Sequence, residues 1–207
     1  MINLLLILLC GVRFIAADVS CSSTLILGWG DSNTEFGYSS DPAANTSWLG
    51  WLNRTEMEWR TYHNAGVSGN TVAQMIARFG ADISPLVGGG DFVVILGGLN
   101  DDVGGASVDT IYRRLQVACS LAATTGAKVL ISTYPMTGGN MYEVNDSLIA
   151  NWATFADGLI DPSADDSIGE GSDHNNATWF VNEYHYTSAG YRRYAELYVA
   201  PTIRNLE

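Results

Sequence analysis

Residues 92–101 read FVVILGGLND, and this stretch decides the fold class. Its first five residues form an unbroken apolar run, which is typical of a strand that is buried on both faces. Two glycines at 97–98 end the run, and the polar residues Asn100 and Asp101 follow closely. Because a strand that is covered on both faces needs helices on each side, the stretch predicts a parallel sheet inside an α/β protein.

Similar apolar runs alternate with helical patterns along the chain. The further strand candidates are residues 24–27, 59–62, 128–132 and 158–160. Apolar residues at helical spacing predict helices over residues 48–52, 71–79, 108–123, 148–155 and about 188–205. The alternation predicts a single three-layer α/β/α sandwich with about five parallel strands that are joined by right-handed crossovers.

Composition limits the classes of partner. The chain has 207 residues, of which 47% are hydrophobic, and this suffices for one core of ordinary size. Lys and Arg number 10 against 22 Asp and Glu, which gives a formal net charge of -12. Such an acidic chain lacks the basic face that binds nucleic acid or anionic lipid, so we expect neither as a partner. We expect a monomer.

The N-terminus has the pattern of a targeting signal. Residues 4–9 are an aliphatic run too short to span a bilayer, which takes about 20 apolar residues, and Ala16 and Ala17 offer a cleavage site. The pattern predicts a secretory signal peptide over residues 1–17, a mature domain over residues 18–207 and a secreted protein. An uncleaved anchor is the alternative. No other segment is apolar for long enough to insert stably in a membrane.

Secretion would expose two kinds of residue in the mature chain to covalent modification. Cys21 and Cys119 either form one disulfide or are two buried thiols. If the host glycosylates, Asn-x-Ser/Thr triplets should lie at the surface, and the chain has four: Asn45, Asn53, Asn145 and Asn176.

Small polar segments follow the strand candidates. Ser32 comes after the first strand and Gly69 after the second, while Asn100 follows the third. His185 lies late in the chain, just before the last predicted helix. Because ligands of such sheets bind beyond the carboxyl ends of the strands, we expect these four residues to lie together.

These residue types would suffice for acyl transfer to water. The hydroxyl of Ser32 becomes a strong nucleophile when a base takes its proton, and the imidazole of His185 titrates near neutral pH. The N–H groups of Ser32 and Gly69, with the amide of Asn100, could hold a developing oxyanion. Each residue alone also has a structural interpretation as a cap or turn, but their shared position favours the catalytic one.

The sequence resembles a known family across nearly the whole mature chain, from Thr24 to about Tyr194. The family is the SGNH hydrolases, also called GDSL esterases and lipases. Its four motif blocks match, in the correct order, Gly30-Asp31-Ser32, Gly69, Gly98-x-Asn100-Asp101 and the late His185.

The resemblance implies both a fold and an activity. It implies a flavodoxin-like α/β/α fold and hydrolysis of ester bonds through an acyl-enzyme on Ser32, with His185 as the base. The oxyanion hole would consist of the N–H groups of Ser32 and Gly69 and the side chain of Asn100. No metal or cofactor would be required.

One position departs from the pattern of that family, which has Asp three residues before the His, where this chain has Asn182. An Asp orients the imidazole and stabilises the imidazolium, whereas Asn can accept the Nδ1–H bond but supplies no charge. Three interpretations follow. Asn182 supports a Ser32–His185 dyad, Glu183 or Asp173 replaces the carboxylate, or the domain binds carbohydrate or lipid without hydrolysis.

The substrate is less well defined by the sequence than the reaction. An acetylated polysaccharide fits an acidic secreted protein, and a small ester or a lipid is the alternative. Near the nucleophile, Trp29 and Tyr38 could line a cleft, whereas Trp48 and Trp51 are expected in the core. The three histidines lack the paired spacing of metal ligands, so we expect no metal site.

Overall fold

The computed structural model describes residues 24–41, 43–56, 60–134, 139–169 and 172–207. The expected signal peptide and Cys21 lie outside these residues, so both expectations about them stay predictions. Within the described part of the chain, no helix is long and apolar enough to cross a membrane.

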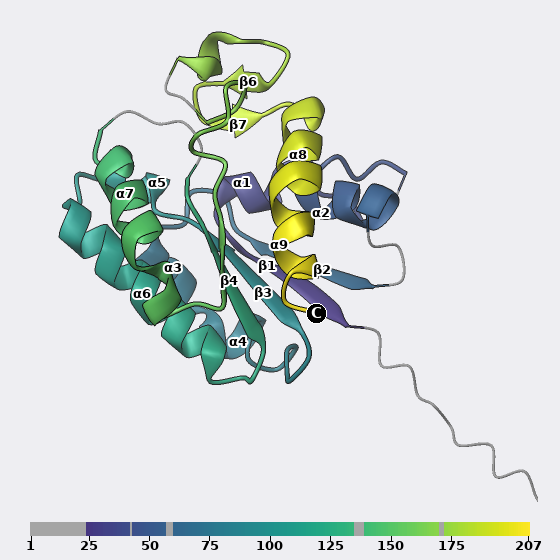
Figure 1. Cartoon of the computed structure of the whole chain (residues 1–207), viewed down its shortest axis with the longest axis vertical. Coiled ribbons are helices and arrows are strands. Elements are labelled where there is room, and N and C mark those ends of the chain that lie inside the picture. The colour runs from purple at the N-terminus through teal and green to yellow at the C-terminus, as the bar shows by residue number, and fades with distance from the viewer. Residues whose placement is uncertain (1–23, 42, 57–59, 135–138, 170–171) are drawn as a thin grey trace, which may run out of the picture.

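Five parallel strands form the central sheet in the order β2-β1-β3-β4-β5 (Figure 1). Gly30 at the end of the first strand pairs with both Gly66 and Leu96, so three strands end side by side. This is the doubly wound order in which ligands bind beyond the carboxyl ends of the strands. The strands are β1 (Leu25–Gly30), β2 (Thr61–Gly66), β3 (Phe92–Leu96), β4 (Lys128–Ser132) and β5 (Gly158–Ile160).

Helices cover both faces of this sheet, so the predicted three-layer sandwich is confirmed (Figure 1). One face carries α3 (Val72–Ala77), α4 (Phe79–Asp82), α5 (Leu99–Val103), α6 (Val108–Ala123) and α7 (Met141–Asn151). The other face carries α2 (Trp48–Trp51), the π-helical η1 (Leu52–Glu56), α8 (Ser188–Tyr194), the π-helical η4 (Ala195–Val199) and α9 (Ala200–Arg204). The short helix α1 (Ser32–Glu35) begins at the carboxyl end of β1.

Alternation of side chains along the strands divides the apolar residues into two clusters. In β1, Leu27 and Trp29 belong to the cluster under α3 and α6, while Ile26 belongs to the cluster under α2 and α8. The expectation that Trp29 could line a cleft is wrong, because its ring is fully buried and packs against Phe79 at 5.5 Å between ring centroids. Tyr38 is 46% exposed.

A two-stranded antiparallel hairpin, β6 (Phe180–Asn182) and β7 (His185–Tyr186), lies above α8 in Figure 1. It packs directly on this helix because Gly190 has no side chain. A Cβ at that position would come within 2.4 Å of the Trp179 carbonyl oxygen. The predicted helix over residues 188–205 is present as α8, η4 and α9 in succession.

One helix differs from its prediction. Residues 148–155 were expected to form it, but α7 starts at Met141 and a 3₁₀ turn, η2 (Trp152–Thr154), follows its end. The polar residue Asn145 breaks the apolar pattern on the inward face. Its buried amide accepts from the Tyr134 N–H at 2.9 Å and donates to the Tyr134 carbonyl at 2.8 Å, so a polar side chain holds a core position.

Burial also corrects the expectation for the glycosylation triplets. Asn45 and Asn145 are only 7% and 6% exposed, so neither side chain is available to a glycan in this fold. Asn176 is exposed and Asn53 is half-buried. Cys119 is buried on α6.

A buried carboxylate fixes the long connection that follows β5. Asp165 accepts bonds from the Arg193 Nε on α8, at 2.9 and 3.0 Å, and from the Tyr198 hydroxyl on η4. It also accepts the Ser167 N–H at 2.8 Å. The loop that precedes the hairpin is therefore held against the helix that supports the hairpin.

Replacing Asp165 by Ala should destabilise the protein by about 3 kcal/mol, because it leaves Arg193 without its charge partner in a mostly buried place. The free energy of unfolding in urea measures the effect. The control is Asp109→Ala, which removes an exposed partner of Arg113 on α6 and should leave the unfolding midpoint almost unchanged. Equal effects of the two substitutions would contradict this role of Asp165.

Candidate active site

Ser32 occupies the first turn of α1, immediately beyond the end of β1. Asp31 caps this helix, and its Oδ1 accepts the Asn33 N–H at 3.0 Å. The turn is pressed against the sheet, since a Cβ on Gly30 would overlap the Thr34 Oγ1 and a Cβ on Gly66 would overlap the Glu35 nitrogen. Ser32 therefore has a fixed backbone, and it is 9% exposed.

The hairpin brings His185 to Ser32. The Ser32 Oγ lies 2.9 Å from the His185 Nε2, although 153 residues separate them in sequence. On the other side of the ring, the His185 Nδ1 lies 3.0 Å from the Asn182 Oδ1. A hydroxyl, an imidazole and an amide oxygen thus form one hydrogen-bonded line, and the structure brings these three candidate residues together.

Backbone bonds decide which way the Asn182 amide faces. Its Oδ1 also accepts the N–H of Tyr184 at 2.9 Å and the N–H of His185 at 3.0 Å. Because N–H groups only donate, the atom that meets them must be the oxygen. The Nδ1 of His185 must then donate its proton to that oxygen, and the unprotonated Nε2 is left to accept from Ser32.

This arrangement also answers the question of a replacement carboxylate. Within the described residues, no hydrogen bond joins His185 to Glu183 or to Asp173. The Glu183 carboxylate instead contacts the Tyr184 hydroxyl, where it raises the pKa of that tyrosine. In the described geometry the partner of the imidazole Nδ1 is Asn182.

The ring of Phe36 covers one face of the imidazole. The two rings stack with centroids 5.1 Å apart and planes inclined by 25°. His185 is half-buried, and this loss of solvent lowers the pKa of the imidazole below its ordinary value of 6.5. The ring is therefore neutral at neutral pH, as a proton acceptor must be.

The ends of β1, β2 and β3 bring N–H donors to the same place. The Asn100 Nδ2 donates to the Asn70 carbonyl at 3.0 Å and lies 3.5 Å from the Asp31 Oδ2. It therefore lies between the segment that follows β2 and the segment that follows β1. Gly69 has a φ of 77°, and nothing lies within 4 Å of the place its Cβ would take. Within the described chain, the N–H groups of Ser32 and Gly69 have no protein acceptor.

Charged side chains hold the segment that follows β2 in position. Arg78 donates from Nε to the Asn70 Oδ1 and from Nη2 to the Gly30 carbonyl, both at 2.9 Å. Asp101, which is fully buried, accepts the Val72 N–H at 2.7 Å at the start of α3. These bonds fix Gly69 and Asn70 relative to the end of β1.

A buried polar network behind Ser32 was not predicted from the sequence. The Tyr134 hydroxyl lies 3.3 Å from both oxygens of Asp31 and accepts from the Asn33 Nδ2 at 2.6 Å. The Tyr191 hydroxyl donates to the Asn33 Oδ1 at 3.0 Å. Burial raises the pKa of the Asp31 carboxyl from 3.8 to about 7, against the opposing bonds from Asn33 and Tyr134.

The same Asn33 side chain joins the nucleophile segment to the hairpin. Its Nδ2 donates to the Tyr184 carbonyl at 2.7 Å, one residue before His185. Asn33 thereby connects the helix that carries Ser32 with the strand that carries the imidazole. The only sequence signal for this residue is its position directly after Ser32, since its partners lie 101 and 158 residues away.

No group of three or more His, Cys, Asp or Glu side chains that could hold a metal ion occurs in the part of the chain that the structure describes. The groups that meet at this edge of the sheet are the hydroxyl of Ser32, the imidazole of His185 and the N–H donors. Serine hydrolases of unrelated folds share this relation between a hydroxyl, a base and an acceptor that orients the base. By its geometry the site has the form of that class.

The chain belongs to the GDSL-like lipase/acylhydrolase family, whose model matches residues 29–193. The match confirms the family that the four motif blocks indicated, and it contains Ser32, Gly69, Asn100 and His185. It establishes the coarse class, a hydrolase that acts on esters. No curated protein sequence matches this chain.

Solved structures of the same fold include several GDSL proteins. A lipolytic protein of the G-D-S-L family from Veillonella parvula is 23% identical, with 84% of this chain and 94% of that chain covered and a TM-score of 0.69. An acetyl xylan esterase is 17% identical, with 88% and 98% covered and a TM-score of 0.67. A GDSL-like lipase from Bacteroides thetaiotaomicron is 19% identical, with 89% of each chain covered and a TM-score of 0.68.

Replacing Asn182 by Asp should move the pH dependence of ester hydrolysis. The wild-type rate should fall as the pH drops through the pKa of His185, which lies below 6.5. A carboxylate on Nδ1 favours the imidazolium, so this acidic limb should shift upward by about one pH unit or more. Above the limb, kcat should rise about tenfold or more, because the converse change in a serine protease costs about 10⁴.

The measurement is kcat and kcat/KM for p-nitrophenyl acetate between pH 4 and 9. Asn151→Asp, which adds the same charge at an exposed position near the end of α7, is the control and should leave the limb in place. An unmoved limb in Asn182→Asp would show that residue 182 does not act on the imidazole.

Proposed function

We propose that the protein is a secreted serine esterase that hydrolyses carboxylic esters through an acyl-enzyme on Ser32. The 2.9 Å contact between the Ser32 Oγ and the His185 Nε2 carries the proposal, since it couples a hydroxyl to a base that is free to accept its proton. The family match supports the reaction class. The aliphatic run at residues 4–9, followed by Ala16 and Ala17, supports secretion.

Acylation follows from the positions of these groups. As the Ser32 Oγ attacks the carbonyl carbon of the ester, its proton passes to the His185 Nε2 and the carbonyl electron pair moves onto oxygen. The N–H groups of Ser32 and Gly69 would hold this oxyanion, each contributing roughly 3–4 kcal/mol, and Asn100 would join them with the amide N–H that only approaches Asp31, at 3.5 Å. The imidazolium then gives the proton to the alcohol oxygen as the C–O bond breaks.

Deacylation reverses these roles with water. His185 takes a proton from water, the oxygen attacks the acyl carbon, and the protonated ring returns the proton to the Ser32 Oγ as the acid leaves. Asn182 holds the ring in the correct tautomer through both steps. Because its amide is neutral, it orients the imidazole without stabilising the imidazolium through charge.

The surroundings of the site are open and partly polar. The space beside Gly69 is open, and Asn182 and Tyr184 lie on the exposed outer part of the hairpin. A protein of the same fold is an acetyl xylan esterase, which supports an acetylated polysaccharide as one substrate class for this chain. A small soluble ester is the simplest probe of this activity.

Ser32→Ala should lower kcat for p-nitrophenyl acetate by at least about 10³-fold, because the nucleophile acts as a unit with its base. Ser120→Ala on the exposed surface of α6 is the matched control and should retain the wild-type rate. A fluorophosphonate should add to Ser32 in the wild-type protein, and mass spectrometry of the peptide that contains this residue would detect it.

The competing function is a binding module that has lost hydrolysis, which the neutral Asn182 at the usual acid position would favour. That function predicts no turnover above the Ser32→Ala rate and no label on Ser32. Either result, obtained with a protein whose thermal unfolding is cooperative, would overturn the esterase assignment.

A further inference from the structure

A surface cavity of about 370 Å³ lies beside α8 and η4, outside the catalytic residues. Its floor is one helical stripe, since Ala189, Arg192, Arg193, Glu196 and Leu197 recur at intervals of three and four residues. Trp179, from the segment that leads into the hairpin, forms the opposite wall. The cavity therefore combines a large aromatic ring, exposed aliphatic surface and two arginines, a mixture that is typical of a ligand site.

Both arginines are held by Nε alone. The Arg192 Nε donates to the Glu196 Oε1 at 2.8 Å, and the Arg193 Nε donates to the two oxygens of Asp165. Within the described residues, the terminal amino groups of Arg192 and Arg193 have no protein acceptor. Each guanidinium has a carboxylate partner at Nε, Glu196 or Asp165, and keeps terminal N–H donors of the kind that suit the two oxygens of a further carboxylate.

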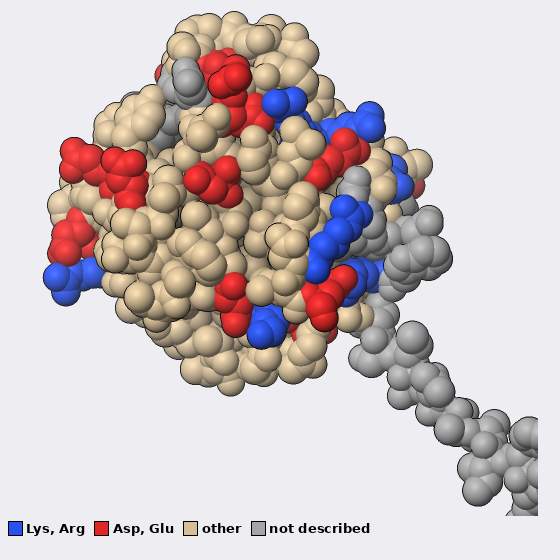
Figure 2. All heavy atoms as spheres, viewed as in Figure 1, with Lys and Arg blue, Asp and Glu red and all other residues tan. Residues whose placement is uncertain are grey.

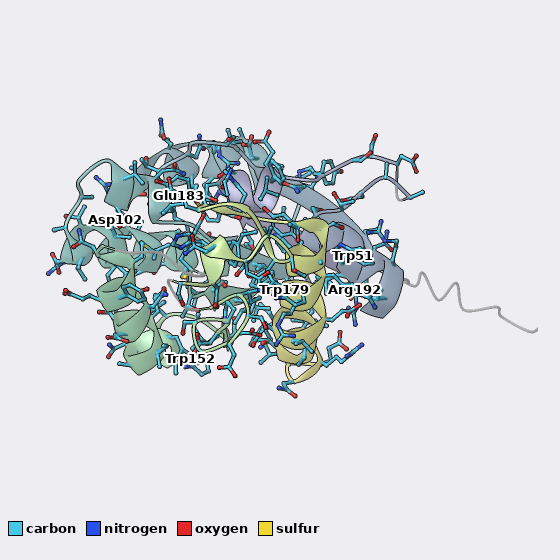
Figure 3. The ribbon with its side chains drawn as sticks, turned by 90° about the horizontal axis from the view of Figure 1, so that it is seen from above. Trp51, Asp102, Trp152, Trp179, Glu183 and Arg192 are labelled. Atoms are coloured by element: carbon cyan, nitrogen blue, oxygen red, sulfur yellow. The ribbon has the colours of Figure 1, made fainter. Side chains whose placement is uncertain are left out.

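Aromatic rings accompany these charges. The Arg193 Cζ lies 5.5 Å from the centroid of the Trp179 ring, and the Arg192 Cζ lies 5.1 Å from that of Trp51. Trp51 is itself fixed by a bond from its Nε1 to the Ser188 Oγ at 3.2 Å. Figure 3 shows Trp179, Arg192 and Trp51 on the same side of the molecule, beside α8.

The charge of this side contrasts with that of the whole protein. The net charge is -12, yet the Lys and Arg side chains gather on the side that carries α8 and α9 (Figure 2). On the side of α5 and α6 the visible charges are mainly acidic. On this face of the molecule, an anionic ligand would meet basic side chains mainly on the side of α8 and α9.

The cavity is also connected to the active site by the hairpin. The Trp179 carbonyl accepts the Thr187 N–H at 2.8 Å, two residues beyond His185. Trp179 lies three residues before Asn182, a distance of about 10 Å along an extended strand. The cavity thus lies on the segment that leads into the strands of Asn182 and His185.

We propose that this cavity binds a sugar ring that bears a carboxylate, as a subsite for an acidic polysaccharide. The Trp179 ring and the side chain of Leu197 offer apolar surface to a pyranose, and the amino groups of Arg192 and Arg193 suit its carboxylate. The link to catalysis rests on the proposed esterase function, but binding in the cavity does not require the chemistry at Ser32.

The test measures binding to the Ser32→Ala protein by isothermal titration calorimetry at low salt. The probe is the tetrasaccharide of galacturonic acid, and neutral xylotetraose and a tetraglutamate peptide are the comparison ligands. The acidic sugar should bind more tightly than either, and its affinity should fall as salt is added. Arg192→Gln should weaken it at least about tenfold, because a bond to a charged group is lost.

Arg113→Gln is the matched control, since Arg113 also pairs with a carboxylate four residues away on an exposed helix but lies on α6. It should leave the affinity unchanged. The proposal is overturned if the acidic sugar does not bind, if the neutral sugar or the peptide binds as tightly, or if the two arginine variants behave alike. Turnover of p-nitrophenyl acetate by the wild-type protein reports separately on the esterase function.

Discussion

The amide oxygen of Asn182 accepts three N–H groups, and the chemistry of the site depends on this one acceptor. Two of the donors belong to the backbone. They hold the oxygen toward the ring of His185 independently of the tautomer of that ring. The third donor is the Nδ1 of that ring. The tautomer that leaves Nε2 free for Ser32 is therefore selected by the turn of the hairpin, without any negative charge.

The rest of the structure brings the other groups to that ring. The parallel register ends three strands at one edge, and Arg78 and Asn100 join the segments that follow them. Asn33 then connects the helix of Ser32 with the hairpin through the Tyr184 carbonyl. Polar side chains that are buried and fully bonded can hold such positions more rigidly than a mobile loop could.

The sequence predicted those features that are written in local patterns. The strands 92–96, 128–132 and 158–160 and the helix 108–123 have the predicted bounds, because each is a continuous apolar run or an amphipathic stripe between turn residues. The candidate catalytic residues could be grouped because they directly follow strands or match known motif blocks. What could not be predicted depends on contacts between distant residues.

Two residues show why. Asn145 looks like a surface residue in the sequence, yet its amide replaces a backbone partner for Tyr134 in the core. A polar side chain at this core position breaks the apolar pattern, so the first two turns of α7 were not predicted. Trp29 follows a strand pattern next to the nucleophile, but alternation along β1 turns it inward. In both cases tertiary packing decided the environment of a residue whose type alone suggested another.

The tautomer of His185 tests the account most directly. A long-range ¹H–¹⁵N spectrum of the protein labelled in histidine, taken at pH 8, separates protonated from unprotonated ring nitrogens, and the His185→Gln variant assigns the signal among the three histidines. The account predicts a proton on Nδ1 and a lone pair on Nε2. A proton on Nε2, or an average of the two forms, would contradict it, because Asn182 would then not set the base that Ser32 needs.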